Sequence, residues 1–226
     1  MTNPRPDVRT PAPPTLWNWV PIRSLAPRHR ARVVTHLLAL GERDRYLRFG
    51  HAATDAQIAK YVDLLDFDRD EIFGIFNRRL ELVGMAHLAF GLEDAAGVPA
   101  YAEFGVSVAI RARGRGFGQR LFEHAMLHAR NRGVRTLHVH ALSENTAMLR
   151  LARKLGAEIV RDGPESEARV ALPPGSLASQ LDEIVSDNAA ELDYQFKSQS
   201  RRFKVVLDLI GEVKAQVGAS SHVGED

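Results

Sequence analysis

The residues with the clearest chemical potential form a glycine-rich and arginine-rich turn at 111–120, RARGRGFGQR. Its three glycines alternate, and glycine lets backbone N–H groups turn toward a single ligand. An apolar-periodic run follows, which predicts a helix whose N-terminus adds a partial positive charge at the same place. The four arginines of the segment are Arg111, Arg113, Arg115 and Arg120. The turn therefore predicts a cradle for an extended polyphosphate ligand, the alternative being a solvated basic turn.

Two familiar phosphate-binding motifs do not fit this turn. A dinucleotide fingerprint has the spacing G-x-G-x-x-G and an acidic residue about twenty positions later. Here the spacing is G-x-G-x-G, and the strand predicted at 136–142 supplies His138 and His140 but no carboxylate. A Walker loop needs a G-K-[S/T] triplet, and the chain has none. Nicotinamide binding and the hydrolysis of nucleoside triphosphates are therefore both disfavoured.

The strand that leads into the turn has two unlike faces. One face is apolar and consists of Ala102, Phe104, Val106, Val108 and Ile110. The other carries little side-chain bulk and consists of Glu103, Gly105, Ser107 and Ala109. Because successive side chains of a strand point to opposite faces, the second face leaves room for something other than its own side chains.

The elements that must position this turn follow from periodicity and capping signals. Before the turn come a short apolar stretch from Leu16, a helix entered at Pro27, a helix with a Thr54–Gln57 capping box, and strands at 71–76, 80–90 and 100–110. After it come a helix closed by Gly133, a strand at 136–142, a helix from Asn145 to Leu155, and a hairpin over 157–162 and 167–172. This order predicts one mixed α/β domain over residues 16–173.

Two flanking segments differ in composition from this domain. Residues 1–15 hold five of the eleven prolines, which predicts a disordered leader. Residues 174–226 carry apolar positions at helical spacing, and from Leu192 onward these positions fit a 3-4 heptad that Gln199 interrupts. We expect an amphipathic helical tail that either packs on its own domain or pairs with another subunit to form a homodimer.

Composition and charge exclude several classes of function. The 226 residues are 45% hydrophobic and 26% charged, as is typical of one globular domain with an appendage. The chain has no cysteine, which excludes disulfides, thiolate metal sites and cysteine nucleophiles. No run approaches the roughly 20 apolar residues of a membrane span, so we expect a cytoplasmic protein without a membrane partner. A net charge of +2 gives no support for nucleic-acid binding.

The turn and its neighbours resemble the GNAT acyltransferases. The cofactor loop of that family is [QR]-x-x-G-x-[GA], and Arg113, Gly116 and Gly118 match it. The preceding AEFGVSVAI is similar to the family's fourth strand, and the later SENTAMLRLARKLGA is similar to its second motif, around Asn145. Three motifs in the expected order make this resemblance specific.

The resemblance implies a fold, a cosubstrate and a set of binding residues. A GNAT sheet is mixed and splayed open, here between the strands ending near Ile110 and Leu142, and the pantetheine arm of acetyl-CoA lies in the split. The backbone at Val106 and Val108 would hold that arm. The remaining cofactor-binding residues implied by the motifs are Arg113, Gly114, Arg115, Gly116, Phe117, Gly118 and Asn145.

The resemblance also implies transfer of an acetyl group to a primary amine by direct attack. Glu103 lies ten residues before Arg113 and is similar to the glutamate that acts as general base in such enzymes, the alternative being a solvated strand-edge glutamate. The N–H of Val106 would stabilise the oxyanion. Many members have a tyrosine as general acid where this chain has Ala152, which leaves open a non-catalytic acyl-CoA sensor. No acid is assigned, and the nearby candidates are Ser143, His140 and Tyr101.

The acceptor is the least specified part of the site. The run DRYLRF at 44–49 resembles the corresponding stretch in the GNAT domains of bacterial protein-lysine acetyltransferases. Small molecules and protein lysines both stay open as acceptors, because acceptor loops vary while the cofactor half does not.

Four histidines invite other interpretations. His124 and His128 lie four residues apart on one helical face, but no acidic or third ligand accompanies them in the sequence. We therefore expect surface positions for this pair and assign no metal. His138 and His140 share one face of a strand, where they either line the substrate cleft or pack in the ordinary way.

Overall fold

The computed structural model describes residues 20–93, 95–175, 180, 183–191, 193 and 194. The helices are α1 (Arg30–Leu38), α2 (Glu42–Phe49), α3 (Asp55–Asp63), α4 (Phe117–Asn131) and α5 (Thr146–Lys154), with short 3-10 turns at Pro27–His29 and Ile110–Ala112. The strands are β1 (Arg23–Ser24), β2 (Glu71–Phe76), β3 (Leu82–Phe90), β4 (Ala102–Val108), β5 (Thr136–Leu142), β6 (Glu158–Asp162) and β7 (Glu165–Ala171). They form one seven-stranded sheet in the order β1-β2-β3-β4-β5-β7-β6.

The expected α/β class and mixed sheet are confirmed, with three local corrections. The sequence analysis does not predict α2, whose residues ERDRYLRF are mostly charged and of which none is buried. Of the strand expected from Leu16, only β1 is a strand in the described residues. Ile110 does not extend the apolar face of β4: the strand ends at Val108, and Ile110 lies in the following 3-10 turn with 68% of its surface exposed.

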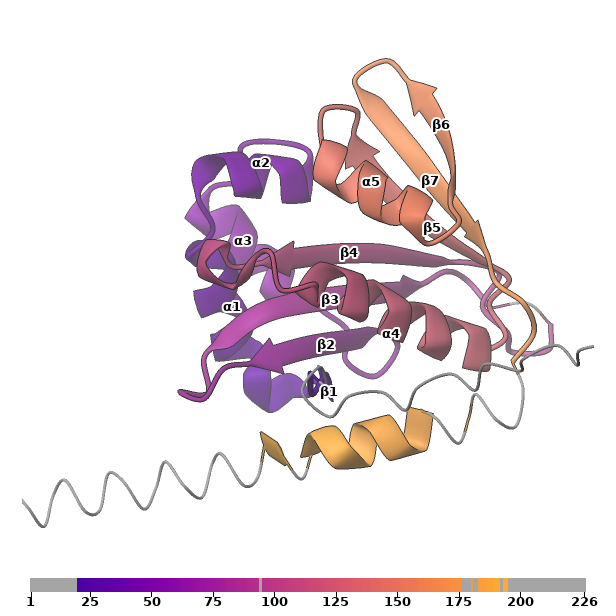
Figure 1. Cartoon of the computed structure of the whole chain (residues 1–226), viewed down its shortest axis with the longest axis horizontal. Helices are drawn as coiled ribbons and strands as arrows, with labels where there is room; N and C mark the ends of the chain where they lie inside the picture. The colour runs from indigo at the N-terminus through magenta and orange to yellow at the C-terminus, as the bar shows by residue number, and fades with distance from the viewer. Residues whose placement is uncertain (1–19, 94, 176–179, 181–182, 192, 195–226) are drawn as a thin grey trace, which may run out of the picture.

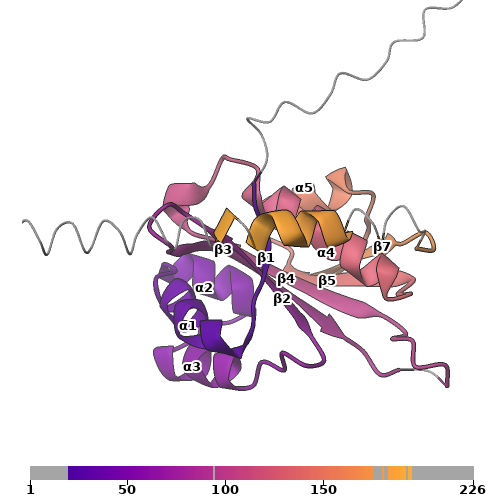
Figure 2. The same ribbon diagram turned by 90° about the horizontal axis from the view of Figure 1, so that it is seen from below.

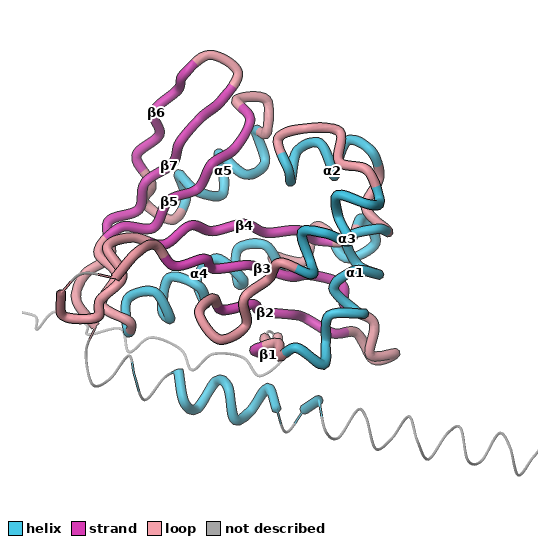
Figure 3. Tube along the Cα trace, turned by 180° about the vertical axis from the view of Figure 1, so that it is seen from behind, coloured by secondary structure: helices cyan, strands magenta, loops and turns pink. Residues whose placement is uncertain are grey.

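Helices cover both faces of the central strands (Figures 1 and 3). On one face α4 buries Leu121 and Phe122, and the ring of Phe122 stacks on Phe104 of β4 with centroids 4.4 Å apart. On the other face α1 and α3 bury Leu37 and Ile58 against the sheet. Full burial of each such side chain stabilises the fold by about 1.5–3 kcal/mol, which holds the sheet firmly between its helices.

The sheet splits between its two parallel strands. β4 and β5 pair only through Ala102 with Leu137 and Glu103 with His138. β5 instead pairs with β7 along its whole length, and Figure 1 shows β5, β6 and β7 turning away from β4. From Phe104 to Val108, no described strand pairs with the edge of β4 that faces β5. The splayed sheet that the family resemblance implies is therefore present.

The described part of the tail packs on the domain. Residues 183–191 are helical and lie beside β1 and α4 (Figures 1 and 2). Glu191 forms an ion pair with Arg23 at 2.5 Å, and the guanidinium of Arg23 lies over the ring of Tyr194 at 3.7 Å. The heptad positions from Leu192 onward and the leader at 1–15 lie outside the described residues. Within the described chain, no helix is both long and apolar enough to cross a bilayer.

Candidate functional site

The turn at 113–118, hereafter the cradle, leads into α4 as predicted. Gly114 and Gly116 both have φ of +74°, a left-handed conformation that side chains disfavour. Gly116 is the N-cap of α4, no side chain caps this end, and the first turn holds no acidic residue. The first N–H groups of a helix have no intrahelical partner, so the amides that follow Gly116 point outward with the positive end of the helix dipole.

A cleft of about 390 Å³, the cradle cleft, opens between the cradle, β4, α2 and α5. Eight of the nine cofactor-binding residues expected from the sequence line it: Val106, Val108, Arg113, Gly114, Gly116, Phe117, Gly118 and Asn145. The ninth, Arg115, lines a neighbouring pocket beside Arg78 and Arg79. The split of the sheet thus brings residues from all three predicted motifs around one space.

The arginines of the turn are not all available to an anion. Arg113 donates from Nε to the carbonyl of Val108 at 3.1 Å and forms an ion pair with Asp44 of α2 at 2.7 Å. Arg111 pairs with Glu81 at 2.9 Å. In the described structure, Arg115 and Arg120 have no ion pair. Two of the four expected cations are therefore engaged with the protein itself, which leaves the backbone amides as the main donors that the cradle could offer an anion.

Asn145 acts as a structural link in addition to lining the cleft. Its Oδ1 accepts a hydrogen bond from the N–H of Met148 at 3.2 Å and so caps α5. Its Nδ2 donates to the carbonyl of Leu47 in α2 at 3.4 Å. The side chain therefore joins two elements that wall the cradle cleft.

A second cleft of about 620 Å³ continues from the first across β4. We call it the carboxylate cleft after four of its lining residues, which are Glu103, Asp162, Glu165 and Glu167. The two clefts share Arg48 and Val106. Glu103 is exposed, so the partial burial that the sequence allowed for this carboxylate is not present. Its neighbour across the split is His138, at the point where β4 and β5 part.

Arg48 occupies the face of β4 that the sequence left open. A Cβ placed on Gly105 would lie 2.7 Å from Arg48 Nη2, so only glycine lets the guanidinium approach β4 this closely. Arg48 Nη2 donates to the hydroxyl of Tyr61 at 3.0 Å, while its buried Nε has no hydrogen-bond partner among the described residues. An unsatisfied donor therefore stands where the two clefts meet.

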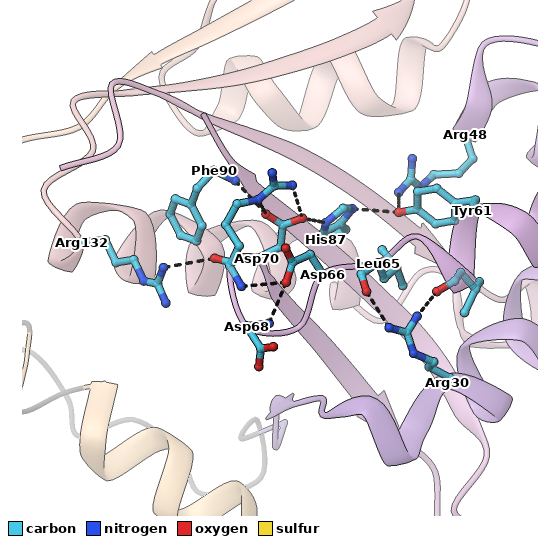
Figure 4. Close-up of polar contacts among 12 residues, drawn as sticks. Arg30, Arg48, Tyr61, Leu65, Asp66, Asp68, Asp70, His87, Phe90 and Arg132 are labelled. Atoms are coloured by element: carbon cyan, nitrogen blue, oxygen red, sulfur yellow. Dashed lines mark hydrogen bonds and ion pairs between the residues drawn. The ribbon is translucent and has the colours of Figure 1, made fainter. Parts of the chain in front are cut away.

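A chain of hydrogen bonds connects Arg48 with a buried carboxylate (Figure 4). Tyr61 donates to Nδ1 of His87 at 2.9 Å, and Nε2 of His87 donates to Asp70 at 3.0 Å. Burial alone would raise the pKa of Asp70, but hydrogen bonds from His87 and Arg69 outweigh it and hold that pKa well below its usual range. The ionised Asp70 therefore fixes His87 and, through Tyr61, the position of Arg48.

Sequence reasoning missed this chain almost entirely. Its members come from three separate elements and from the loop that holds Asp70, and only the resemblance of 44–49 to an acceptor-shaping stretch pointed to Arg48. The signal available in the sequence was Gly105 on the face of β4 with little side-chain bulk, which leaves space for another group. Only the structure shows that Arg48 fills this space.

A second buried contact secures β4 at Ser107. Nδ1–H of His36 donates to the carbonyl of Leu82 at 3.0 Å, which leaves Nε2 to accept from the Ser107 hydroxyl at 2.9 Å. Burial lowers the pKa of His36 to about 4, so the ring is neutral near pH 7. The bond ties the strand that lines the cradle cleft to α1.

The three candidate acids lie in different surroundings. The Ser143 hydroxyl bonds to the carbonyl groups of Gly163 and Glu165, at 3.0 and 2.9 Å. The ring of Tyr101 packs against that of His138, and neither Tyr101 nor Ser143 lines the two clefts. His140 is exposed and lines the carboxylate cleft. Ala152, where many relatives have a tyrosine, is fully buried in the core.

Of the four histidines singled out in the sequence, the other three are His138, which contacts a carboxylate, and His124 and His128, whose expected positions the structure corrects. Nδ1 of His138 forms a hydrogen bond with Oε1 of Glu167 at 2.6 Å. The surface positions expected for His124 and His128 are wrong: their side chains are 7% and 4% exposed. Both rings lie against Phe73 of β2, with centroids 4.7 Å apart, because the tail and β2 cover this side of α4.

Comparison with known proteins agrees with this architecture. Residues 38–157, just over half of the chain, match the acetyltransferase (GNAT) family. The GNAT domain of S. lividans PAT is similar in structure, with a TM-score of 0.56, 20% sequence identity, and coverage of 67% of this chain and 89% of that one. A GNAT-family acetyltransferase from Streptococcus pneumoniae has a TM-score of 0.53 and 16% identity, with 67% and 98% covered. A ribosomal-protein-alanine N-acetyltransferase from Brucella melitensis has a TM-score of 0.50 and 17% identity, with 67% and 99% covered. The structural likenesses establish the fold, and the family match establishes that the chain belongs to the GNAT acetyltransferases.

Proposed function

We propose that this protein transfers an acetyl group from acetyl-CoA to a primary amine by direct attack, without a covalent enzyme intermediate. One observation carries the proposal: the cradle cleft and the carboxylate cleft meet at Arg48 and Val106, within the split of the sheet. An anion-binding backbone lies in one cleft and a candidate base, Glu103, in the other. A ligand that runs from the cradle to the junction would present its far end to an acceptor in the second cleft.

The residues of the cradle cleft suit acetyl-CoA. A Cβ on Gly114 would meet no atom within 4 Å, and the nearest atom to one on Gly116 is Nε of Arg120 at 4.0 Å. Space that a side chain could fill is thus left beside the uncapped N-terminus of α4, as a diphosphate requires. The free edge of β4 at Val106 and Val108 offers backbone groups to the amide-rich pantetheine arm. When bound, acetyl-CoA supplies the activated acetyl group.

The chain's own residues would supply proton transfer and charge stabilisation. A lysine-like amine is protonated at pH 7, with an ordinary pKa of about 10.4, and must lose a proton before it attacks. Glu103 takes that proton, directly or through one water molecule. The N–H of Val106, on the stretch of β4 that β5 leaves unpaired, would stabilise the developing oxyanion. We assign no side chain as the general acid.

The charge of the carboxylate cleft favours a cationic acceptor. Four carboxylates line it, and Arg48 is the permanent cation among its described lining residues. Glu167 is paired with Arg169 at 2.6 Å, so the excess negative charge comes from Glu103, Asp162 and Glu165. Such a cleft attracts ammonium groups and repels anionic acceptors. Amines that carry a further positive charge near the reacting nitrogen therefore fit the cleft best.

A pH profile of turnover tests this function. We expect purified protein to release CoA with lysine peptides or polyamines, and Glu103→Gln to lower kcat by about 100-fold at pH 7. The loss shrinks toward the ordinary pKa of the amine, because the acceptor then deprotonates without help. Glu165→Gln, in the same cleft, is the matched control and should raise KM without changing the pH dependence of kcat.

Two results would contradict the proposal. If acetyl-CoA binds but no amine yields CoA, the chain is a binding module for acyl-CoA. If Glu103→Gln loses the same factor at every pH, Glu103 has a structural role only.

A further inference from the structure

The described tail meets α4 at a cluster of ionisable side chains that the acetyl-transfer site does not use. This tail cluster consists of His124, His128, Glu71, Glu183 and Asp187. We propose that it binds a divalent transition-metal ion, with His124, His128 and Asp187 as the ligands. The third, acidic ligand that the sequence did not reveal comes from the helical residues 183–191 of the tail.

The ligand atoms already converge. Oδ1 of Asp187 lies 3.8 Å from Nε2 of His124 and 3.9 Å from Nε2 of His128. One ligand atom from each of the three residues lies within 4.8 Å of the others. Two ligands at about 2.1 Å from a tetrahedral zinc ion are about 3.4 Å apart, so side-chain shifts of about 1 Å or less bring the three atoms to that spacing.

The same three atoms are buried and unsatisfied. Nε2 of His124, Nε2 of His128 and Oδ1 of Asp187 have no hydrogen-bond partner in the described structure. Leaving one such buried group unpaired costs about 1–3 kcal/mol, and three that face one point are unusual. A single cation between them satisfies all three at once.

Neighbouring groups orient the ligands as metal sites require. Oε2 of Glu71 lies 2.6 Å from Nδ1 of His128, and Oε1 of Glu183 lies 3.3 Å from the same nitrogen. A carboxylate on the far nitrogen fixes the tautomer that leaves Nε2 free for a metal. The ring of Phe73 against both imidazoles restricts their rotation.

The charges of the cluster match a dication. Glu71, Glu183 and Asp187 bring three negative charges together. Among the described residues that pair with them, Arg132, at 2.9 Å from Glu71, is the only permanent cation. Two negative charges are left over when both histidines are neutral, as ligation requires.

The ligand set indicates the metal and its role. Two imidazoles and one carboxylate suit zinc better than magnesium or calcium, which prefer oxygen ligands. The histidines lie farther along α4 than the cradle, so the ion would not take part in acetyl transfer. It would instead join residues 183–191 of the tail to the domain.

Metal titration of the full chain tests the inference. After chelation and dialysis, Zn²⁺ alone should bind with one ion per chain and a dissociation constant of about 1 μM or lower. Co²⁺ should give the strong visible absorption of a tetrahedral site. Asp187→Asn should raise the dissociation constant at least roughly tenfold. Asp187 is 37% exposed, so this variant should keep its fold, which circular dichroism checks.

Two matched variants locate the site. Glu191→Gln, on the same helical segment, should leave zinc affinity unchanged. His140→Gln, which disrupts the second group of close ligands formed by His138, His140 and Glu167, should also leave it unchanged. Zinc should slow amide hydrogen exchange over 183–191 in the wild type and not in Asp187→Asn. Failure of the wild type to bind zinc, full affinity in Asp187→Asn, or loss of affinity in His140→Gln would overturn the inference.

Discussion

The cradle predicts a specific effect of a side chain at Gly116. Because its φ is +74°, valine there costs roughly 2 kcal/mol of backbone strain. For a chain of this length each kcal/mol lowers Tm by about 2–4 °C, so we expect a fall of about 4–8 °C. The isopropyl group also enters the space beside the first amides of α4. Loss of one charge-assisted hydrogen bond to the diphosphate costs about 2 kcal/mol, which is about 30-fold in Kd.

Gly156 provides the matched control. Its φ is +86°, a Cβ there meets nothing within 4 Å, and it follows α5 outside both clefts. Gly156→Val should therefore suffer a similar loss of Tm and keep its affinity for CoA. The comparison separates backbone strain, which both variants share, from obstruction of the ligand, which only Gly116→Val has.

Calorimetry with two ligands completes the test. CoA and dephospho-CoA both carry the diphosphate, so Gly116→Val should weaken both by about the same factor. A variant that folds and binds CoA with wild-type affinity would refute the cradle. Equal losses of affinity in Gly116→Val and Gly156→Val would show that strain, and not contact with the diphosphate, controls binding.

Three further predictions concern the groups that support the clefts. Asp70→Asn removes the buried carboxylate that accepts from His87, and should lower the free energy of unfolding by about 3 kcal/mol in urea denaturation, whereas the exposed Asp68→Asn should change it little. The pKa of His36 is about 4 in the folded state against about 6.5 when unfolded, so the unfolded state binds a proton first as the pH falls. The free energy of unfolding should therefore keep the full contribution of His36 above pH 6.5 and fall by about 3 kcal/mol toward pH 4, and it should fall less in His36→Gln. Gly105→Ala should displace the guanidinium above it, raising the KM for the amine severalfold with little change in Tm; unchanged kinetics would contradict the placement of that guanidinium.

Much of the fold follows from local signals in the sequence. The capping box of Thr54 and Gln57 is present at the start of α3, and β2 occupies 71–76 as expected. These signals depend on nearby residues, so they survive in the folded chain. α2 shows the opposite case, because its side chains bind residues far along the chain: Asp44 pairs with Arg113 at 2.7 Å, and Arg48 donates to the hydroxyl of Tyr61 at 3.0 Å. Such contacts depend on tertiary structure, and the periodicity of apolar residues in the sequence does not predict them.

The two histidines of α4 show the same limit for a candidate site. Their spacing of four residues is visible in the sequence, yet their burial depends on β2 and on the tail. Asp187 lies far along the chain and becomes a neighbour only after the tail packs beside α4. Motifs within one segment, such as the cradle, are predictable, whereas sites assembled from distant segments require the fold.

The position of α2 has a consequence for ligand binding. No residue of α2 is buried, and its apolar contact with the core is at its C-terminal end, where Phe49 packs edge-on to Tyr61 with ring centroids 5.4 Å apart. Polar contacts fix it to three surrounding elements: Asp44 to Arg113 of the cradle, the Leu47 carbonyl to Asn145, and Arg48 to Tyr61 of α3. α2 also forms one wall of both clefts. Exchanging a hydrogen bond costs less free energy than moving a packed core side chain, so we expect a ligand that competes for Arg113 or Arg48 to shift α2 while the sheet stays in place. We therefore expect the contacts that position α2 to let both clefts adjust to what they bind.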